Sequence, residues 1–378
     1  MKAPRLLLVV NVDWFFVSHR LPIAEAAIRE GYEVHLACAC TGLKEELEAR
    51  GLIVHELRLG RRDLSLPSLG GGAMRIAALL RSIEPDIVHL ITIKPVLLGG
   101  IAARLSGVKN VLAAISGLGY VFISQGISAR VRRALVSFLY RLALGSRHVV
   151  AVFQNPTDAA EVCKIAGLRP EQVKIIRGSG VNLEQLSVKP LIGGDTVLTF
   201  AGRLLIDKGL REFIAAACML KAQGVEARFL VAGDPDPDNP SSVDPAELER
   251  WREEGVVELI GYQDEIGDLF ARSHAVVLPS YREGLPKTLA EAAACGRAVV
   301  TTDVPGCRDA VIPDESALLV PPMTVEPLAM AMKQLIEDRE LCAAMGRAGR
   351  KLAEDAFGID RVVDAHLSIY AEMLERGL

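Results

Sequence analysis

Two glutamates, Glu283 and Glu291, flank the predicted start of a helix, where their carboxylates could bind hydroxyl groups beside a phosphate. The apolar run 275–279 predicts a buried strand, Pro286 suits the first helical turn, and Gly296 suits the helix end. Glu283 is therefore expected before the helix and Glu291 about two turns inside it. Unpaired N–H groups at a helix N-terminus attract phosphates. Carboxylates next to a phosphate are costly unless each binds a hydroxyl or a cation. A sugar nucleotide offers hydroxyls on both sides of its diphosphate.

A second segment of the same kind offers two cations. The run 196–201 predicts a strand, and the loop that follows contains Arg203 and Lys208 between two glycines, Gly202 and Gly209. Open α/β sheets bind ligands at the carboxyl ends of their strands. Arg203 and Lys208 could neutralise a diphosphate together. Either cation alone would be read as a solvated loop charge, but the glutamate segment favours a ligand site.

Apolar runs that alternate with helix-length segments must position these loops. Such runs are typical of buried parallel strands, and two series of them predict two doubly wound α/β domains. The first series comprises residues 6–10, 33–38, 53–57, 86–90, 108–115, 148–152 and 173–176, and the second 197–201, 227–232, 256–260, 275–278, 298–301 and 317–320. We expect a first domain at 1–186, a hinge with Pro and Gly at 187–195, a second domain at 196–359 and an amphipathic helix at 360–378.

Composition excludes several classes of protein. The chain has 378 residues, half of them hydrophobic, which favours two large cores. A net charge of -4 gives no general attraction to nucleic acid. Cys38 and Cys40 do not complete a zinc site and are expected to be reduced core residues. The sequence offers neither a convincing signal peptide nor an apolar run of about 18 residues, so we expect a cytoplasmic protein.

Both ligand segments resemble the retaining glycosyltransferases of family 4, which have the GT-B fold. The resemblance rests on Gly202, Arg203, Lys208 and Gly209, and on the spacing of Glu283 and Glu291. It implies two Rossmann-like domains that face a cleft, with the C-terminal helix crossing back to the N-terminal domain. The segments 13–22, 92–95, 117–122 and 234–240 resemble one branch of this family, which includes enzymes that add N-acetylhexosamines to polyprenyl-diphosphate-linked glycans.

The resemblance also implies roles for residues at the donor site. Arg203 and Lys208 would hold the donor diphosphate, Glu283 the donor-sugar hydroxyls and Glu291 the ribose, with no metal or other cofactor. Many members carry a His-Gly pair where this chain has Ser116 and Gly117, which puts the role of the histidine in doubt here. We expect catalysis from Arg203, Lys208 and Glu283, and a donor site formed by Gly202, Arg203, Lys208, Tyr262, Glu283, Gly284, Leu285, Glu291 and Gly117. Tyr262 either stacks on the nucleotide base or covers a strand edge.

The segment 11–20 is expected to be a loop at the ligand edge of the first sheet. Its Asp13, Ser18 and His19 are candidates for binding the acceptor, although Ser18 could instead cap a helix. Lys94 is a candidate ligand of an acceptor diphosphate, or else a surface charge ahead of a helix.

Basic and large apolar residues alternate between residues 128 and 144. A helix of this composition suits anionic lipid headgroups, and Arg130, Arg132 and Arg133 are the expected membrane contacts. The simpler alternative is an amphipathic helix that faces the core and has a solvated basic edge. Because the resembled branch uses a lipid-linked acceptor, we expect peripheral attachment to the cytoplasmic face of the inner membrane.

The expected reaction moves a hexosamine, GalNAc or GlcNAc, from a UDP-sugar to a polyprenyl-diphosphate-linked saccharide. Retention of configuration would follow from same-face attack, because no residue of the sequence stands out as a covalent nucleophile. Fold does not fix the reaction, so a sugar-nucleotide epimerase and a non-catalytic sugar-nucleotide-binding protein remain alternatives. A phosphorylase would need a lysine-bound pyridoxal phosphate, which no segment suggests.

Overall fold

The computed structural model describes residues 3–59, 66–118, 127–191 and 193–376, with side chains except those of 66–67, 127–132 and 376. The chain forms two compact units. Unit 1 comprises residues 1–179 and 360–378, and unit 2 comprises residues 180–359. Within the described ranges, no helix combines the length and the apolar character needed to cross a bilayer.

Unit 1 contains a seven-stranded parallel sheet in the order β3-β2-β1-β4-β5-β6-β7. Every strand falls on one of the predicted apolar runs, and the strands are β1 (Arg5–Val12), β2 (Glu33–Ala39), β3 (Ile53–Glu56), β4 (Ile87–Ile91), β5 (Val111–Ile115), β6 (Val149–Phe153) and β7 (Val173–Ile175). Both faces of the sheet are apolar because helices cover both. In β1, Leu7 and Val9 belong to one core cluster, whereas Leu6 and Leu8 belong to the other.

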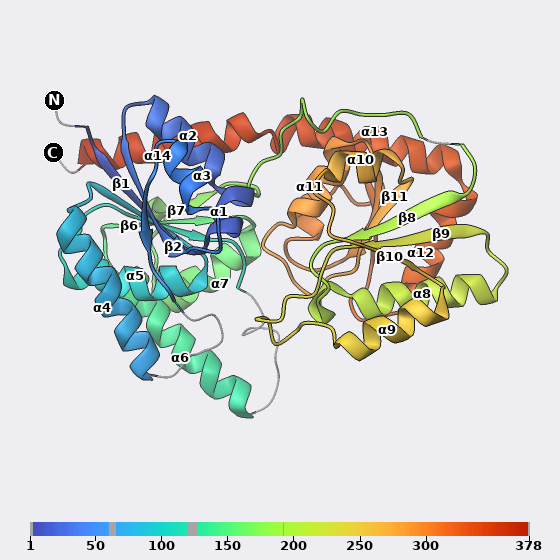
Figure 1. Cartoon of the computed structure of the whole chain (residues 1–378), viewed down its shortest axis with the longest axis horizontal. Helices are drawn as coiled ribbons and strands as arrows, with labels where there is room; N and C mark the ends of the chain where they lie inside the picture. The colour runs from blue at the N-terminus through green and yellow to red at the C-terminus, as the bar shows by residue number, and fades with distance from the viewer. Residues whose placement is uncertain (1–2, 60–65, 119–126, 192, 377–378) are drawn as a thin grey trace. The chain divides into compact units, whose positions relative to one another are not determined.

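The helices of unit 1 lie in two layers (Figure 1). One layer comprises α4 (Leu66–Ile83), α5 (Ile93–Leu105), α6 (Ile127–Leu144) and α7 (Pro156–Ala166). The other layer comprises α1 (Asp13–His19), α2 (Leu21–Arg29), α3 (Lys44–Ala49) and the last helix, α14 (Ile359–Arg376). From α14, Val362, Ile369 and Tyr370 pack into the same core cluster as the first strand.

The predicted loop at 11–20 is wrong. The strand β1 continues to Val12, and α1 follows at once. Asp13 lies in the first helical turn, where its carboxylate accepts a hydrogen bond from the Trp14 N–H, and Phe16 is buried in the core. Ser18 lies in the last turn of α1, and the residue at the N-cap of the next helix, α2, is Arg20, so Ser18 is not that cap.

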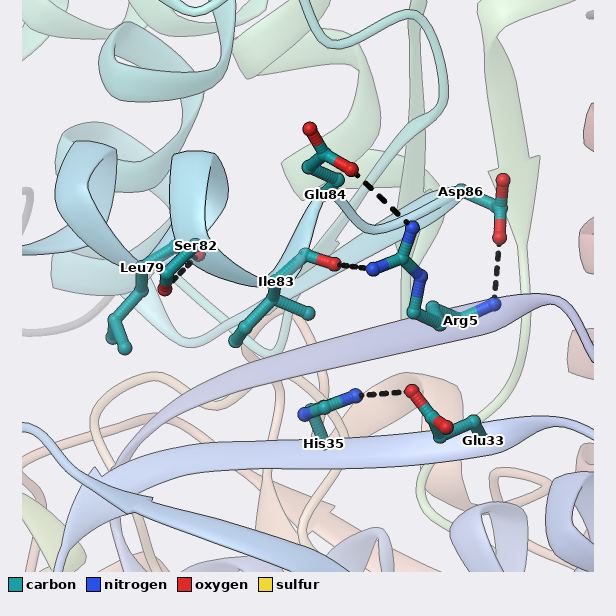
Figure 2. A network of polar contacts seen from close by, with 8 residues as sticks. All are labelled: Arg5, Glu33, His35, Leu79, Ser82, Ile83, Glu84 and Asp86. Carbon is teal, nitrogen blue, oxygen red and sulfur yellow. Dashed lines mark hydrogen bonds and ion pairs between the residues drawn. The ribbon is translucent and has the colours of Figure 1, made fainter.

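Arg5 fixes the amino end of the unit 1 sheet (Figure 2). Its backbone N–H donates to Asp86 Oδ2 at 2.7 Å, and its guanidinium donates to the Ile83 carbonyl and lies 3.6 Å from Glu84 Oε2. These contacts tie the start of β1 to the turn between α4 and β4. The carboxyl ends of the same strands lie at the opposite edge of the sheet, where the candidate acceptor residues follow them.

Unit 2 contains a six-stranded parallel sheet in the order β10-β9-β8-β11-β12-β13. The strands again match the predicted runs, and they are β8 (Thr196–Ala201), β9 (Ala227–Ala232), β10 (Glu258–Gly261), β11 (Ala275–Leu278), β12 (Ala298–Thr302) and β13 (Ala317–Val320). The helices α8 (Leu210–Ala222), α9 (Pro245–Glu254) and α12 (Glu326–Glu337) lie on one face, and α10 (Ile266–Ala271), α11 (Lys287–Ala294) and α13 (Arg339–Ala356) on the other (Figure 1). These two sheets confirm the predicted doubly wound α/β architecture.

A polar cluster is buried in unit 1 between β4 and α14. His89 Nδ1 and the Tyr370 hydroxyl are 2.7 Å apart, and the His89 ring lies against the ring of His366 at 5.5 Å between centroids. His366 Nδ1 bonds to the Val362 carbonyl at 2.7 Å. Burial lowers the pKa of His366 to about 3 and holds the pKa of His89 well below its usual range, and the nearby Arg20 charge contributes to both shifts. Both histidines are therefore neutral in the folded protein.

The two neutral histidines should make unit 1 sensitive to acid. In the unfolded chain both titrate near pH 6.5, so below that pH the unfolded state binds more protons than the folded state. The free energy of unfolding of unit 1 should fall as the pH drops below 6.5, by about 1.4 kcal/mol per pH unit for each histidine. Urea titrations at pH 7, 6 and 5 measure this slope.

The tryptophans allow unit 1 to be followed alone, because Trp14 lies in unit 1 and Trp251 in unit 2. In a Trp251→Phe background, His366→Gln should reduce the slope of the unfolding free energy against pH by the contribution of one proton. The half-buried His148 replaced by Gln serves as the control. An unchanged slope in the His366 variant would show that this ring is charged in the folded protein.

Candidate functional site

The polar residues of unit 2 gather where β8, β9 and β11 end. The N–H of Gly202 donates to the Ala232 carbonyl at 3.0 Å, so the loops after β8 and β9 run side by side. Gly233 has a φ of +133°, and a Cβ there would lie 1.9 Å from the Gly202 oxygen. Only glycine at position 233 allows these two loops to approach so closely.

The loop that contains Arg203 and Lys208 bends back onto the end of β11. Lys208 closes a short 3-10 turn, Ile206–Lys208, and Gly209 follows with a φ of +75° as the residue before α8. A Cβ at Gly209 would lie 2.1 Å from the Pro279 carbonyl oxygen. The Tyr281 N–H donates to the Asp207 carbonyl at 2.9 Å, which joins the loop to the glutamate segment.

This approach brings Lys208 and Glu283 together. The Lys208 ammonium donates to Glu283 Oε1, and the two side chains are only 20% and 15% exposed. The Glu283 N–H donates to the Pro305 carbonyl at 3.2 Å, which holds the glutamate loop against the end of β12. The cation and the carboxylate expected at the donor site therefore form an ion pair with each other.

Arg203 has a different carboxylate partner. Its Nη1 lies 2.8 Å from Asp236 Oδ2, and 44% of the Arg203 side chain is exposed. Asp236 belongs to the proline-rich segment 234–240, which contributes to the family resemblance but for which the sequence predicted no site residue. The alternation of prolines with aspartates indicates a loop, but it does not indicate which carboxylate would pair with Arg203.

The second glutamate lies on α11. This helix begins at Lys287, with Pro286 before it, so Glu291 lies little more than one turn inside the helix and not the expected two. Glu291 Oε1 is 3.3 Å from Lys287 Nζ. Burial raises the pKa of the Glu291 carboxyl, and the Lys287 charge opposes that rise. The Thr288 hydroxyl donates to the Ala201 carbonyl at 3.2 Å, which fixes the start of α11 beside the end of β8.

Two further groups close to the ion pair affect its chemistry. Burial raises the pKa of the Asp207 carboxyl, which the Lys208 charge counteracts, and Asp207 Oδ1 has no hydrogen-bond partner among the described residues. Burial also raises the pKa of the Cys307 thiol to about 12, with the Glu283 charge adding to the effect. Cys307 is therefore protonated at neutral pH and is a poor nucleophile.

Other predicted donor residues lie at the same edge of unit 2 or in unit 1. Gly284 and Leu285 are buried between Glu283 and α11. Tyr262 follows β10, two strands from β8, and is 68% exposed. Gly117 follows β5 in unit 1 with a φ of +126°.

The candidate acceptor residues of unit 1 differ in their surroundings. Asp13 is fully buried, and its carboxylate accepts bonds from the Thr41 N–H and hydroxyl at 2.5 Å, which shape the loop after β2. Ser18 is exposed, and the ring of His19 stacks on Phe15 at 4.1 Å between centroids. Lys94 is 9% exposed in the first turn of α5. All four follow β1 or β4, which are neighbours in the sheet.

The basic segment is described only in part. The side chains of Arg130 and Arg132 lie outside the described residues, whereas Arg133 is exposed on α6. Phe138 and Leu142 of the same helix are exposed as well.

Comparison with known proteins identifies the family. The family model described as Glycosyl transferases group 1 matches residues 183–352, and the model described as Glycosyl transferase 4-like matches residues 5–154. The chain is a glycosyltransferase of the GT-B fold. The matched ranges include Arg203, Lys208 and both glutamates in the first model, and the carboxyl ends of β1, β4 and β5 in the second.

Relatives of this glycosyltransferase cover nearly its full length. It is 28% identical to the N,N'-diacetylbacillosaminyl-diphospho-undecaprenol alpha-1,3-N-acetylgalactosaminyltransferase of Campylobacter jejuni, over 95% of this chain and 98% of the relative. It is 23% identical to the capsular polysaccharide biosynthesis glycosyltransferase CapM of Staphylococcus aureus, over 95% and 96%. Sucrose-phosphate synthase from Thermosynechococcus elongatus shares the fold with a TM-score of 0.82 at 19% identity, over 99% of this chain and 100% of that one. These matches do not favour the epimerase or the non-catalytic alternative.

Replacing either cation beside the glutamate loop should slow glycosyl transfer while the protein stays folded. Lys208→Ala and Arg203→Ala should each lower the rate by roughly a hundredfold or more, or about 2.7 kcal/mol, because positive charge opposite the leaving diphosphate is lost. Steady-state rates and melting curves measure the two effects. Arg211→Ala is the matched control, since Arg211 lies in the first turn of α8 and pairs with Glu247 at 2.8 Å. Near-normal turnover by both variants would contradict the diphosphate role.

Proposed function

We propose that this glycosyltransferase moves an N-acetylhexosamine, GalNAc or GlcNAc, from a UDP-sugar to a polyprenyl-diphosphate-linked saccharide and retains the anomeric configuration. The observation that supports a donor site in unit 2 is the junction of the Arg203–Lys208 loop with Glu283 at the ends of β8 and β11. The acceptor class is supported by the Campylobacter jejuni relative, whose name specifies a diphospho-undecaprenol substrate.

In this proposal, donor binding exchanges the partners of the two cations. Lys208 is bonded to Glu283, and Arg203 is bonded to Asp236. A diphosphate carries more charge than either carboxylate, so it draws both cations toward the phosphates. Glu283 is then available to accept hydrogen bonds from hydroxyls of the donor sugar, and Glu291 to accept them from the ribose. Arg203, Lys208 and the first amides of α11 supply the positive charge, so no metal or cofactor is part of the proposal.

The cations act mainly in the transition state. The bond between the anomeric carbon and the phosphate oxygen breaks, so negative charge on the diphosphate increases, and fixed positive charge stabilises that change. The acceptor oxygen forms its bond to the anomeric carbon from the same face, and its proton passes to the leaving phosphate. Cys307 is a neutral thiol, and Glu283 binds hydroxyls of the donor sugar, so neither acts as a covalent nucleophile in this proposal.

A panel of UDP-sugars with short-chain polyprenyl-diphosphate saccharides tests this function. UDP should be released only when a donor and an acceptor are both present, and NMR of the product should show the anomeric configuration of the donor. Lys208→Ala serves as the background control. Release of UDP without an acceptor, formation of an epimerised UDP-sugar, or no reaction with any pair would each contradict the proposal.

We also propose that unit 1 attaches to the cytoplasmic face of the inner membrane through its α4–α6 layer. These three neighbouring helices lie on one face of the sheet (Figure 1). Each exposes a large apolar side chain, namely Met74, Leu105 and Phe138, the last of which is 58% exposed. Arginines accompany them, including the exposed Arg133. Apolar insertion and attraction to anionic lipid would act together.

Binding to vesicles that contain phosphatidylglycerol should weaken as salt rises, without vanishing, because apolar insertion resists screening. Phe138→Ser should reduce the salt-resistant part, and charge reversal at Arg130, Arg132 and Arg133 should reduce the salt-sensitive part. Sedimentation of the protein with vesicles measures both effects. The matched control is Met330→Ser, since Met330 is an exposed apolar residue on α12 of unit 2. If all these variants bind as the parent protein does, membrane docking through this layer is excluded.

A further inference from the structure

Arg20 is a charged residue buried at the carboxyl edge of the unit 1 sheet. It lies between α1 and α2 and is 2% exposed. Its Nη1 donates to the His19 carbonyl at 2.9 Å and to Ser179 Oγ at 3.1 Å, and its Nη2 donates to Ser116 Oγ at 3.4 Å. The guanidinium thus reaches the loop after β5, through Ser116, and the loop after β7, through Ser179.

No carboxylate within the described ranges pairs with Arg20. Every hydrogen bond it makes there goes to a neutral oxygen, and its Nε has no partner. Three described ionisable groups interact electrostatically with Arg20, namely His89, His366 and Tyr370, and burial keeps all three neutral at pH 7. Burial lowers the pKa of Arg20 to about 10, which still leaves it charged. A buried charge without a counter-ion is strongly unfavourable, so a fold that keeps one has a use for it outside stability.

Other polar atoms at this edge of unit 1 lack partners too. Asn11 Oδ1, near the end of β1, and Thr92 Oγ1, just after β4, are buried and bond to no other described residue. Thr92 also has a φ of +71°, a backbone conformation that a β-branched residue rarely adopts. Strain and unsatisfied polar groups persist where the surrounding structure serves a ligand.

We infer that Ser116 and Ser179, with the Arg20 charge behind them, form a subsite in unit 1 for the diphosphate of a substrate. Ser116 is half-buried whereas Arg20 is buried, so its hydroxyl can accept from the guanidinium and donate to a phosphate oxygen. Arg20 is a positioning residue, because it orients these hydroxyls and supplies the charge that the phosphate neutralises. The inference rests on the proposed function, in which both the donor and the acceptor carry a diphosphate.

Three variants separate the effect of the Arg20 charge on binding from the effect of its hydrogen bonds on the structure. Arg20→Met removes the charge at similar volume, Arg20→Lys keeps it, and Ser116→Ala removes one hydroxyl. Arg20→Met should raise KM for a diphosphate substrate at least tenfold and weaken calorimetric binding of inorganic pyrophosphate or UDP, while the melting temperature does not fall. Arg20→Lys keeps the charge but not the planar fork of donors, so its KM should rise less than that of Arg20→Met. A rise in KM confined to the UDP-sugar assigns the subsite to the donor, and one confined to the lipid-linked acceptor assigns it to the acceptor.

The decisive comparison uses an acceptor whose diphosphate is replaced by a neutral linker. Arg20→Met should leave KM for that acceptor unchanged. Arg5→Met is the matched control, since Arg5 is in the same sheet but lies against Glu84 at the opposite edge, and it should change stability without changing KM. Unchanged KM values for both diphosphate substrates, or an equal rise with the neutral acceptor, would overturn the inference.

Calorimetry keeps the inference separate from the proposed reaction. If no sugar pair turns over, the proposed function fails, but pyrophosphate and UDP binding by Arg20→Met still tests the charge. If Arg20→Met does not fold, Arg20→Lys and Ser116→Ala decide. Binding that is still detected in the lysine variant and is weakened several-fold in the alanine variant supports the subsite, and any other pattern overturns it.

Discussion

In each sheet the strand order reverses between two neighbouring strands, and polar groups of each unit follow the carboxyl ends of those two strands. In unit 2 the order turns between β8 and β11, which are neighbours in space although the loops after them are 75 residues apart at Lys208 and Glu283. In unit 1 it turns between β1 and β4, which precede Arg20 and Thr92. Loops that follow two such strands leave in opposite directions and open a crevice for ligands. Gly209, which packs on the Pro279 carbonyl, sets how closely the unit 2 loops meet.

The two units balance charge in opposite ways. In unit 2, Lys208 and Arg203 each have a carboxylate partner, so a ligand binds there by exchanging partners. In unit 1, Arg20 bonds only to neutral oxygens among the described residues. Breaking the two ion pairs costs a ligand part of its binding energy, but the same pairs keep the cations from destabilising the protein. An uncompensated cation destabilises the ligand-free protein and so favours an anion more strongly when one arrives. The unit 2 site therefore has cations with carboxylate partners, whereas the unit 1 site has a cation that favours the binding of an anion.

The elements that sequence reasoning found were those with a strong local signal. Continuous apolar runs marked every strand of both sheets, and the glycines beside Arg203 and Lys208 marked a loop at a strand end. The helix α1 was missed because Asp13, Ser18 and His19 are residue types common in loops, while its fit depends on Phe16 packing into the core and on Thr41 bonding to Asp13. Arg20 could not have been singled out, since its partners Ser116 and Ser179 lie 96 and 159 residues away.

The last helix makes unit 1 depend on the end of the chain. Val181 and Ile359 bond to each other where unit 2 begins and ends, so the chain leaves unit 2 beside the point where it entered. From there α14 brings Tyr370 to His89 and adds Val362 and Ile369 to the core over β1. Residues 1–179 alone would expose that apolar surface and leave His89 Nδ1 without its partner, both of which are unfavourable. The core beneath the edge that holds Arg20 is therefore complete only after α14 has packed, which couples the unit 1 site to the folding of the whole chain.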